Sequence, residues 1–168
     1  MKKIFIGLLI VLVAIQFIHP SKNLSGDTQK DISTLYPMPD SVQVIVNKAC
    51  ADCHSNKTNY PWYSKIQPVD FWLENHVKDG KRHFNFNEFA SYRIGKQNKK
   101  LEECIEQIKE GEMPLSSYTL IHKEAILTEA EKNILTNWYQ KIVDTIHANY
   151  PADSLKLKGR NPKPNEAK

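Results

Sequence analysis

The chain has 168 residues, a length that suits one compact domain with tails and is too short for two domains of ordinary size. The formal net charge is +4 at pH 7, to which Lys2 and Lys3 contribute +2 and residues 153–168 contribute +3, so residues 21–152 carry −1. A nearly neutral domain lacks the positively charged surface that binding to nucleic acid requires, so we exclude nucleic acid as a partner.

The first segment is an apolar run from Ile4 to Ile18 that follows Lys2 and Lys3. Its 15 residues would span roughly 22 Å as a helix, which is short of a full hydrocarbon core and typical of an export signal. No small-x-small cleavage site follows the run, so we expect residues 1–20 to be an uncleaved anchor in the inner membrane, with a cleaved signal as the alternative. With the two lysines in the cytoplasm, the domain faces the periplasm.

Residues 21–38 are polar and contain prolines, and we expect them to form a tether in which no core forms. Asp40 is then expected to be the N-cap of a helix that opens a domain over residues 39–148. The apolar face of this helix comes from residues at helical spacing, namely Val42, Ile45, Val46 and Ala49. We expect Cys50 to lie at the C-terminal end of this helix.

Cys50, Cys53 and His54 form a Cys-x-x-Cys-His motif, the attachment pattern of c-type haem. Two thiols at this spacing can form thioethers with the vinyl groups of one porphyrin, and the next imidazole can bind its iron. A thioredoxin-like motif needs a βαβ context that the sequence does not predict, and a structural zinc site needs a second close pair of ligands. We therefore predict one haem c, bound covalently through both cysteines.

The region after the motif is rich in Asn, Pro and aromatic residues over positions 56–68, so we expect a loop there. A short helix is predicted over residues 69–78. Three aromatic residues beyond it mark a buried turn or a strand-like piece whose geometry the sequence leaves open: Phe84, Phe86 and Phe89.

A further helix is expected to end near Gly111, the residue type that favours helix C-termini. Its apolar face contains Leu101, Cys104, Ile105 and Ile108. Because Cys104 lies on this face, we interpret it as a core residue and not as a third redox thiol.

The last predicted helix starts at a capping box formed by Thr128 and Glu131. Its apolar face contains Ile134, Leu135, Trp138, Tyr139, Ile142 and Ile146. Together the segments predict a single all-α domain with long loops. The basic, proline-containing tail over residues 149–168 is expected to be a solvated end.

Met113 is the best candidate for a second iron ligand. The following Pro114 fixes its own φ and biases Met113 towards an extended conformation. The thioether of Met113 can therefore be held in one direction, towards an iron. The main rival is His83, which lies among aromatic residues. Weaker candidates are His76, His122, His147 and, on the tether, Met38.

The chain resembles a family of small haem-binding domain proteins with one Cys-x-x-Cys-His motif, from about Gln16 to Tyr139. The segments that carry the resemblance are Gln16–Pro20, Cys50–Asn56, Tyr60–Tyr63, His83–Phe86, Gly111–Pro114, Tyr118–His122 and Leu127–Glu131. The order of motifs is also similar to that of class I cytochrome c.

The resemblance implies a cytochrome c-like fold and a periplasmic monohaem cytochrome, with His54 and Met113 as axial ligands. Because His83 belongs to a recurring motif of the family, it stays a candidate ligand or pocket residue. Leu115 and Ser116 stand where the family often has a second proline and an aromatic residue, which leaves the wall around Met113 open.

The expected function is single-electron transfer to an unknown redox partner, without catalytic residues. A carbonyl in the proline-rich loop, such as that of Pro68, is expected to orient His54, and Trp62 and Tyr63 either shield the porphyrin edge or pack within the loop. The alternative is a haem-based sensor or a peroxidase-like enzyme with a displaceable sixth ligand, in which His83 and Arg82 supply an acid-base group. A third class is a docking module whose haem serves a larger enzyme.

Overall fold

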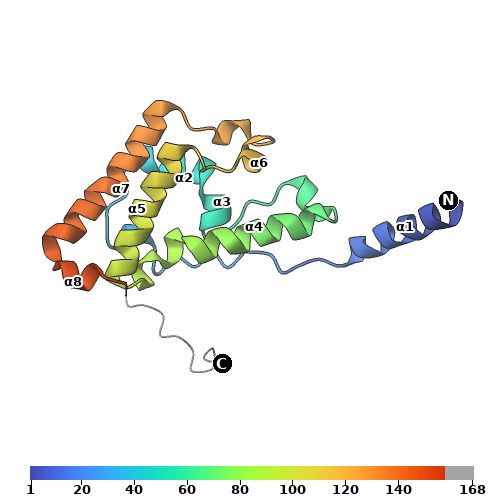
Figure 1. Cartoon of the computed structure of the whole chain (residues 1–168), viewed down its shortest axis with the longest axis horizontal. Coiled ribbons are helices and arrows are strands. Elements are labelled where there is room, and N and C mark those ends of the chain that lie inside the picture. The colour runs from blue at the N-terminus through green and yellow to red at the C-terminus, as the bar shows by residue number, and fades with distance from the viewer. Residues whose placement is uncertain (158–168) are drawn as a thin grey trace, which may run out of the picture.

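The computed structural model describes residues 1–157, and within them all regular structure is helical (Figure 1). The α-helices are α1 (Lys2–Ala14), α2 (Asp40–Ala49), α3 (Ala51–His54), α4 (Val69–His83), α5 (Ile94–Glu110), α6 (Ser116–Thr119), α7 (Glu129–Asn149) and α8 (Ala152–Leu155). Five short 3₁₀ helices lie between them: η1 (Ile15–Phe17), η2 (Ile32–Thr34), η3 (Trp62–Lys65), η4 (Phe86–Ser91) and η5 (Lys123–Ala125). For these residues the prediction of an all-α domain is confirmed.

The core forms where α5 and α7 pack along each other and α2 packs against α7 (Figure 1). Its central side chains are fully or almost fully buried: Val42, Phe89, Leu101, Leu135, Tyr139 and Ile146. The haem motif follows directly from this core, because α3 continues from the end of α2 and packs against α4. Ile134 was expected on the buried face of α7, but it is 40% exposed.

Local sequence signals explain where two of the longer helices begin and end. Thr128 and Glu131 form the predicted capping box, in which each side chain bonds to the backbone of the other residue. The α5 helix ends at Gly111, whose φ of +77° lies in the left-handed region that favours glycine. Both predictions are confirmed.

Two other predictions about the elements need correction, and one open question is settled. The N-cap of α2 is Pro39, and Asp40 is the first residue of the helix. There its negative charge still interacts favourably with the positive end of the helix dipole. The α4 helix continues five residues beyond the expected end at position 78 and reaches His83. Phe86 and Phe89 are buried in the 3₁₀ helix η4, which settles the geometry that the sequence left open between a turn and a strand-like piece.

The segment before α2 is part of the folded domain, so the expectation that no core forms there is wrong. Ile32 is 0% exposed and belongs to the core cluster. The Asp31 side chain caps η2 by accepting a bond from Ser33 N at 2.8 Å, and it also accepts one from Asn87 Nδ2 at 2.6 Å. The contact between Asp31 and Asn87 joins residues 56 positions apart in the sequence.

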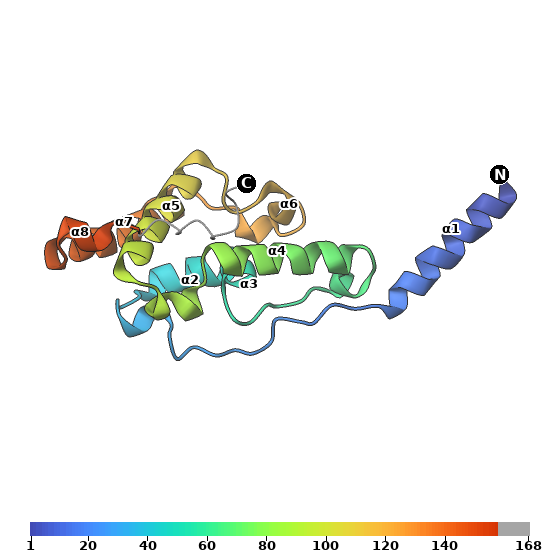
Figure 2. The ribbon, with the colours of Figure 1, turned by 60° about the horizontal axis from the view of Figure 1, so that its bottom comes forward.

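The N-terminal helix lies outside the central domain. The α1 helix projects away from the domain with exposed side chains (Figure 2). Among residues 1–157, none of the helices has the length and apolar character needed to cross a membrane.

At the C-terminal end of the described residues, α8 packs against α5, so the first part of the predicted solvated tail is folded. Residues 158–168 of that tail lie outside the described part.

Candidate functional site

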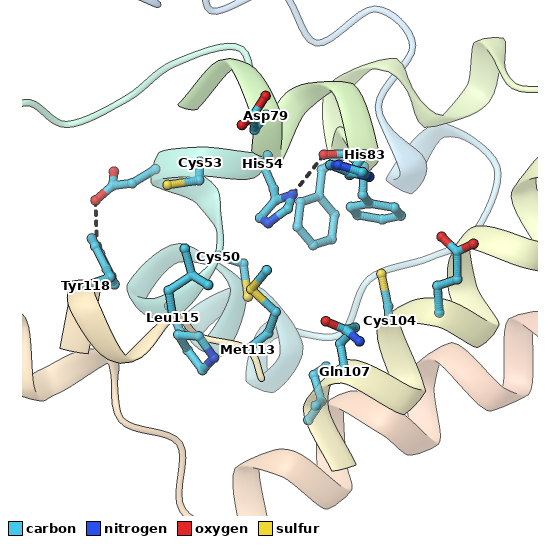
Figure 3. Close-up of a pocket in the computed structure, with 18 of the residues that line it drawn as sticks. Cys50, Cys53, His54, Asp79, His83, Cys104, Gln107, Met113, Leu115 and Tyr118 are labelled. Carbon is cyan, nitrogen blue, oxygen red and sulfur yellow. Dashed lines mark hydrogen bonds between the residues drawn. The ribbon is translucent and has the colours of Figure 1, made fainter. Parts of the chain in front are cut away.

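A cavity of about 470 Å³ lies beside α3, between α4 and α5, and is bordered by the segment that joins α5 to α6 (Figure 3). Most of its lining is apolar, and its volume is in the range of small-molecule and cofactor sites. The motif residues Cys50, Cys53 and His54 line it, as do the ligand candidates His76, His83 and Met113.

The Cys-x-x-Cys-His motif is wound into a single helical turn. Cys53 N and His54 N both donate to the Cys50 carbonyl, at 3.2 and 3.0 Å, and this brings the three side chains to one wall of the cavity (Figure 3). Burial raises the pKa of Cys50 to about 12 and that of Cys53 to about 11. Both groups are therefore neutral thiols at pH 7.

His54 is oriented by the backbone at the end of α4. Its Nδ1 lies 2.9 Å from the Phe84 carbonyl oxygen, which can only accept, so the ring proton is on Nδ1. Burial lowers the pKa of His54, which favours the neutral ring and leaves the Nε2 lone pair free. The acceptor predicted in the loop was Pro68, but that carbonyl accepts from Trp72 N instead.

Gly80 is a site residue that the sequence analysis missed. A Cβ atom at this position would lie 2.5 Å from the Cys53 carbonyl oxygen and 3.0 Å from Cys53 Cβ. Only glycine therefore lets α4 pack this closely against the motif. A lone glycine in a predicted helix gives no sign of such a contact, because the partner lies far away in the sequence.

Met113 reaches the cavity from the C-terminal end of α5. The backbone N–H groups of Glu112 and Met113 both donate to the Gln107 carbonyl, at 2.9 and 3.2 Å, so the chain folds back over the helix end after Gly111. Figure 3 shows the side chains of Met113 and His54 pointing into the same cavity from different elements. The structure thus brings together the two residues proposed as axial ligands.

The rival ligands are placed less favourably. His83 lines the cavity but is exposed, and His76 also lines it while its Nδ1 bonds to the Trp72 carbonyl. Both ring nitrogens of His122 are engaged, by Tyr63 and by Glu124. Two further candidates lie outside the cavity lining: His147 and Met38.

A chain of polar contacts closes the cavity beside the motif. Tyr118 Oη donates to Asp52 Oδ2 at 2.8 Å, and its ring stacks on His122 with centroids 4.4 Å apart. His122 in turn bonds to the hydroxyl of Tyr63 at 2.6 Å. Of the two alternatives left open for Tyr63 and Trp62, the structure favours packing outside the site, because neither residue lines the cavity, whereas Tyr118 does.

Cys104 has two roles in the packing. It packs against the core, as expected, and it also lines the cavity from α5. Burial raises the pKa of Cys104 to about 12, so it is a neutral thiol in an apolar wall. The nearby Lys100 favours the thiolate, but burial outweighs it, so Cys104 is not activated as a nucleophile.

The residues around the cavity fit a haem. Two neutral thiols, an imidazole with a free Nε2 and a thioether converge on one largely apolar cavity. The competing interpretations, a thioredoxin-like redox motif and a zinc site, find less support. Residues 1–157 contain no strand for a thioredoxin-like site. Within the same residues, no group of three or more His, Cys, Asp or Glu side chains could hold a metal ion.

The helical fold and this cavity are consistent with a protein that binds haem. A family described as "Haem-binding domain" matches residues 10–141, and the chain belongs to that family. Comparison with curated proteins and with solved structures gives no match.

Proposed function

We propose that the protein is a periplasmic monohaem c-type cytochrome that transfers single electrons. Cys50 and Cys53 would attach one haem covalently, and His54 and Met113 would ligate its iron. The observation that carries the proposal is the convergence of these four side chains on one apolar cavity.

A haem held there would supply an iron that takes up and releases one electron. The protein would hold the two side chains that bind the iron in fixed positions. The Phe84 carbonyl holds the His54 ring, and the Gln107 carbonyl holds the backbone of Met113. With both side chains held, His54 and Met113 would move little when the iron gains or loses an electron. An iron bound by one thioether and one imidazole would have a higher potential than an iron bound by two imidazoles.

The location is part of the proposal. Lys2 and Lys3 before an apolar run are typical of a segment that directs export and faces the cytoplasm with its basic end. Export suits c-type haem, which bacteria attach outside the cytoplasm. We propose that residues 4–18 hold the domain at the periplasmic face of the inner membrane.

A haem-based sensor or a peroxidase-like enzyme is the second candidate, because His83 lines the cavity. Its proposed acid-base partner Arg82 is not part of the cavity lining, and Arg82 Nη2 lies 2.9 Å from Oδ1 of Asp79 at the edge of the cavity. This arrangement favours the electron carrier over the enzyme.

Mass spectrometry of the denatured protein tests the proposal, after expression in a strain that matures c-type cytochromes. We expect the mass of the chain plus one haem, and loss of covalent haem when Cys50 and Cys53 are both replaced by alanine. Cys104→Ala is the matched control and should keep the haem. Haem that extracts into acidified organic solvent from the wild-type protein would contradict covalent attachment.

A further inference from the structure

The segment that follows α1 is bound to the domain by reciprocal hydrogen bonds. Gln16 Nε2 donates to the Gln67 carbonyl at 3.2 Å, and Gln67 N donates to Gln16 Oε1 at 2.9 Å. Gln67 Nε2 also donates to the Ile18 carbonyl at 2.6 Å. These bonds fix the end of the N-terminal helical segment at the junction between η3 and α4.

A buried carboxylate on α4 reinforces this attachment. Asp70 is fully buried and forms an ion pair with Lys22, and its Oδ2 lies within hydrogen-bond distance, 2.8 Å, of His19 Nδ1. Lys22 also lies 3.4 Å from the buried Glu74. A buried carboxylate is costly without partners, so residues 16–22 are required for this side of the domain. We call these contacts the N-terminal clamp.

Large apolar side chains are exposed around the N-terminal clamp. Trp62 is 75% exposed, Ile66 44%, Phe71 39% and Trp72 45%. They lie in η3, in the short link after it and in the first turn of α4, on both sides of Gln67 in the sequence. We call these four residues the aromatic end. An exposed group of this kind marks an interaction surface.

The aromatic end is continuous with the apolar N-terminal segment. Phe17 and Ile18 are exposed beside the N-terminal clamp, and α1 leaves the domain at the end where α4 begins (Figures 1 and 2). The α1 helix is apolar on all sides, a property of helices buried in protein or in lipid. Lys65, which is exposed between Trp62 and Ile66, adds a positive charge suited to anionic head groups.

We infer that the aromatic end rests on a phospholipid bilayer beside the point where residues 4–18 enter it. Tryptophan favours this interface because its ring is apolar and its N–H is polar. The inference rests on the proposed membrane location and adds a fixed orientation of the domain. Since α4 rises about 1.5 Å per residue, Gly80 lies roughly 15 Å along the helix from Asp70, so the part of the cavity next to the Cys-x-x-Cys-His motif is held on the side away from the lipid.

Photolabelling of the full-length holoprotein tests the inference. The protein is reconstituted in vesicles of phosphatidylethanolamine and phosphatidylglycerol that contain a lipid with a diazirine in its acyl chain. After irradiation, peptide mapping locates the label. We expect label in residues 4–18 and also in residues 62–72, with little in the peptide that contains Val44, an exposed apolar residue on α2.

Two variants sharpen the result. Replacing Trp62 and Trp72 together by serine removes exposed side chains and should leave the fold and the haem content unchanged. It should reduce the label in residues 62–72 to the level of the Val44 peptide. Tyr150→Ser, at the far end of α7, is the matched control and should leave the pattern as in wild type.

The outcomes separate this inference from the proposed location and from haem binding. Label confined to residues 4–18 would show that the domain stands clear of the bilayer, and would overturn the inference alone. Absence of label from the whole chain would overturn the membrane location as well. Haem content, measured on the same samples, reports on the haem proposal independently.

Discussion

Tyr118 donates a hydrogen bond to Asp52 at 2.8 Å, and this bond joins α6 to the Cys-x-x-Cys-His motif. Tyr118 lies five residues after Met113, and Asp52 lies between the two cysteines. Burial and the nearby Asp52 carboxylate raise the pKa of Tyr118, so the hydroxyl stays protonated and can donate. The bond therefore holds the proposed distal ligand segment against the motif.

Tyr118→Phe should loosen the Met113 segment. Loss of one bond to a partly exposed carboxylate should lower the free energy of unfolding by about 1 kcal/mol. The same energy should raise the affinity of the ferric protein for added imidazole about fivefold, because imidazole must displace Met113. A spectrophotometric titration measures this affinity. Unchanged imidazole binding in Tyr118→Phe, as expected for the control Tyr150→Phe, would show that the bond does not hold the ligand segment.

Gly80→Ala should disturb the motif directly. The new methyl group would meet the Cys53 carbonyl oxygen at 2.5 Å, so α4 must move away at a cost of about 1 to 3 kcal/mol. We expect a lower urea midpoint and a smaller fraction of chains with attached haem. Gly7→Ala is the control, since a Cβ there has no neighbour within 4 Å. Wild-type stability and haem content in Gly80→Ala would contradict the close packing.

Glu131→Gln should change the pH dependence of stability. Hydrogen bonds from Lys48 and from the Thr128 backbone lower the pKa of Glu131 from its ordinary value of 4.5 to about 2. The carboxylate therefore stabilises the fold fully above about pH 4.5, and this contribution is lost as the pH falls towards 2.

Urea unfolding at pH 7 and pH 3 checks this prediction. At pH 7 the variant should be about 1 kcal/mol less stable than the wild type, as for loss of a helix cap. The difference should be smaller at pH 3. An equal difference at both values would show that the charge of Glu131 makes no contribution.

The N-terminal clamp predicts that the mature protein keeps its N-terminal segment. Removal of the first twenty residues would take away Gln16 and His19 and would leave Asp70 with Lys22 as its remaining ion-pair partner. N-terminal sequencing of the protein from inner membranes should therefore begin at Met1 or Lys2. A mature chain that starts between Ser21 and Asp27 would show that the segment is a removed signal.

The sequence predicted those features that depend on neighbours along the chain. The capping box at Thr128, the end of α5 at Gly111 and the placement of the motif after α2 all follow from short patterns. The position of Met113 in the cavity was also predicted, because glycine and proline on either side restrict the backbone.

Features that depend on distant partners could not be predicted in this way. The Phe84 carbonyl becomes the acceptor of His54 only because α4 continues to His83 and returns beside the motif. Ile32 is buried because η2 packs against η4, although its neighbours in the sequence are polar. Gly80 and Tyr118 likewise owe their roles to contacts with the motif from far along the chain.

Axial ligation by His54 and Met113 is the central claim, and it separates the carrier from the enzyme. The most direct measurement is the visible spectrum of the reduced holoprotein with and without carbon monoxide, for wild type, Met113→Ala and His83→Ala. We predict a low-spin wild type and a low-spin His83→Ala that react little with carbon monoxide, and a Met113→Ala that binds it readily. Rapid binding by the wild type, or a wild-type spectrum in Met113→Ala together with its loss in His83→Ala, would contradict the account.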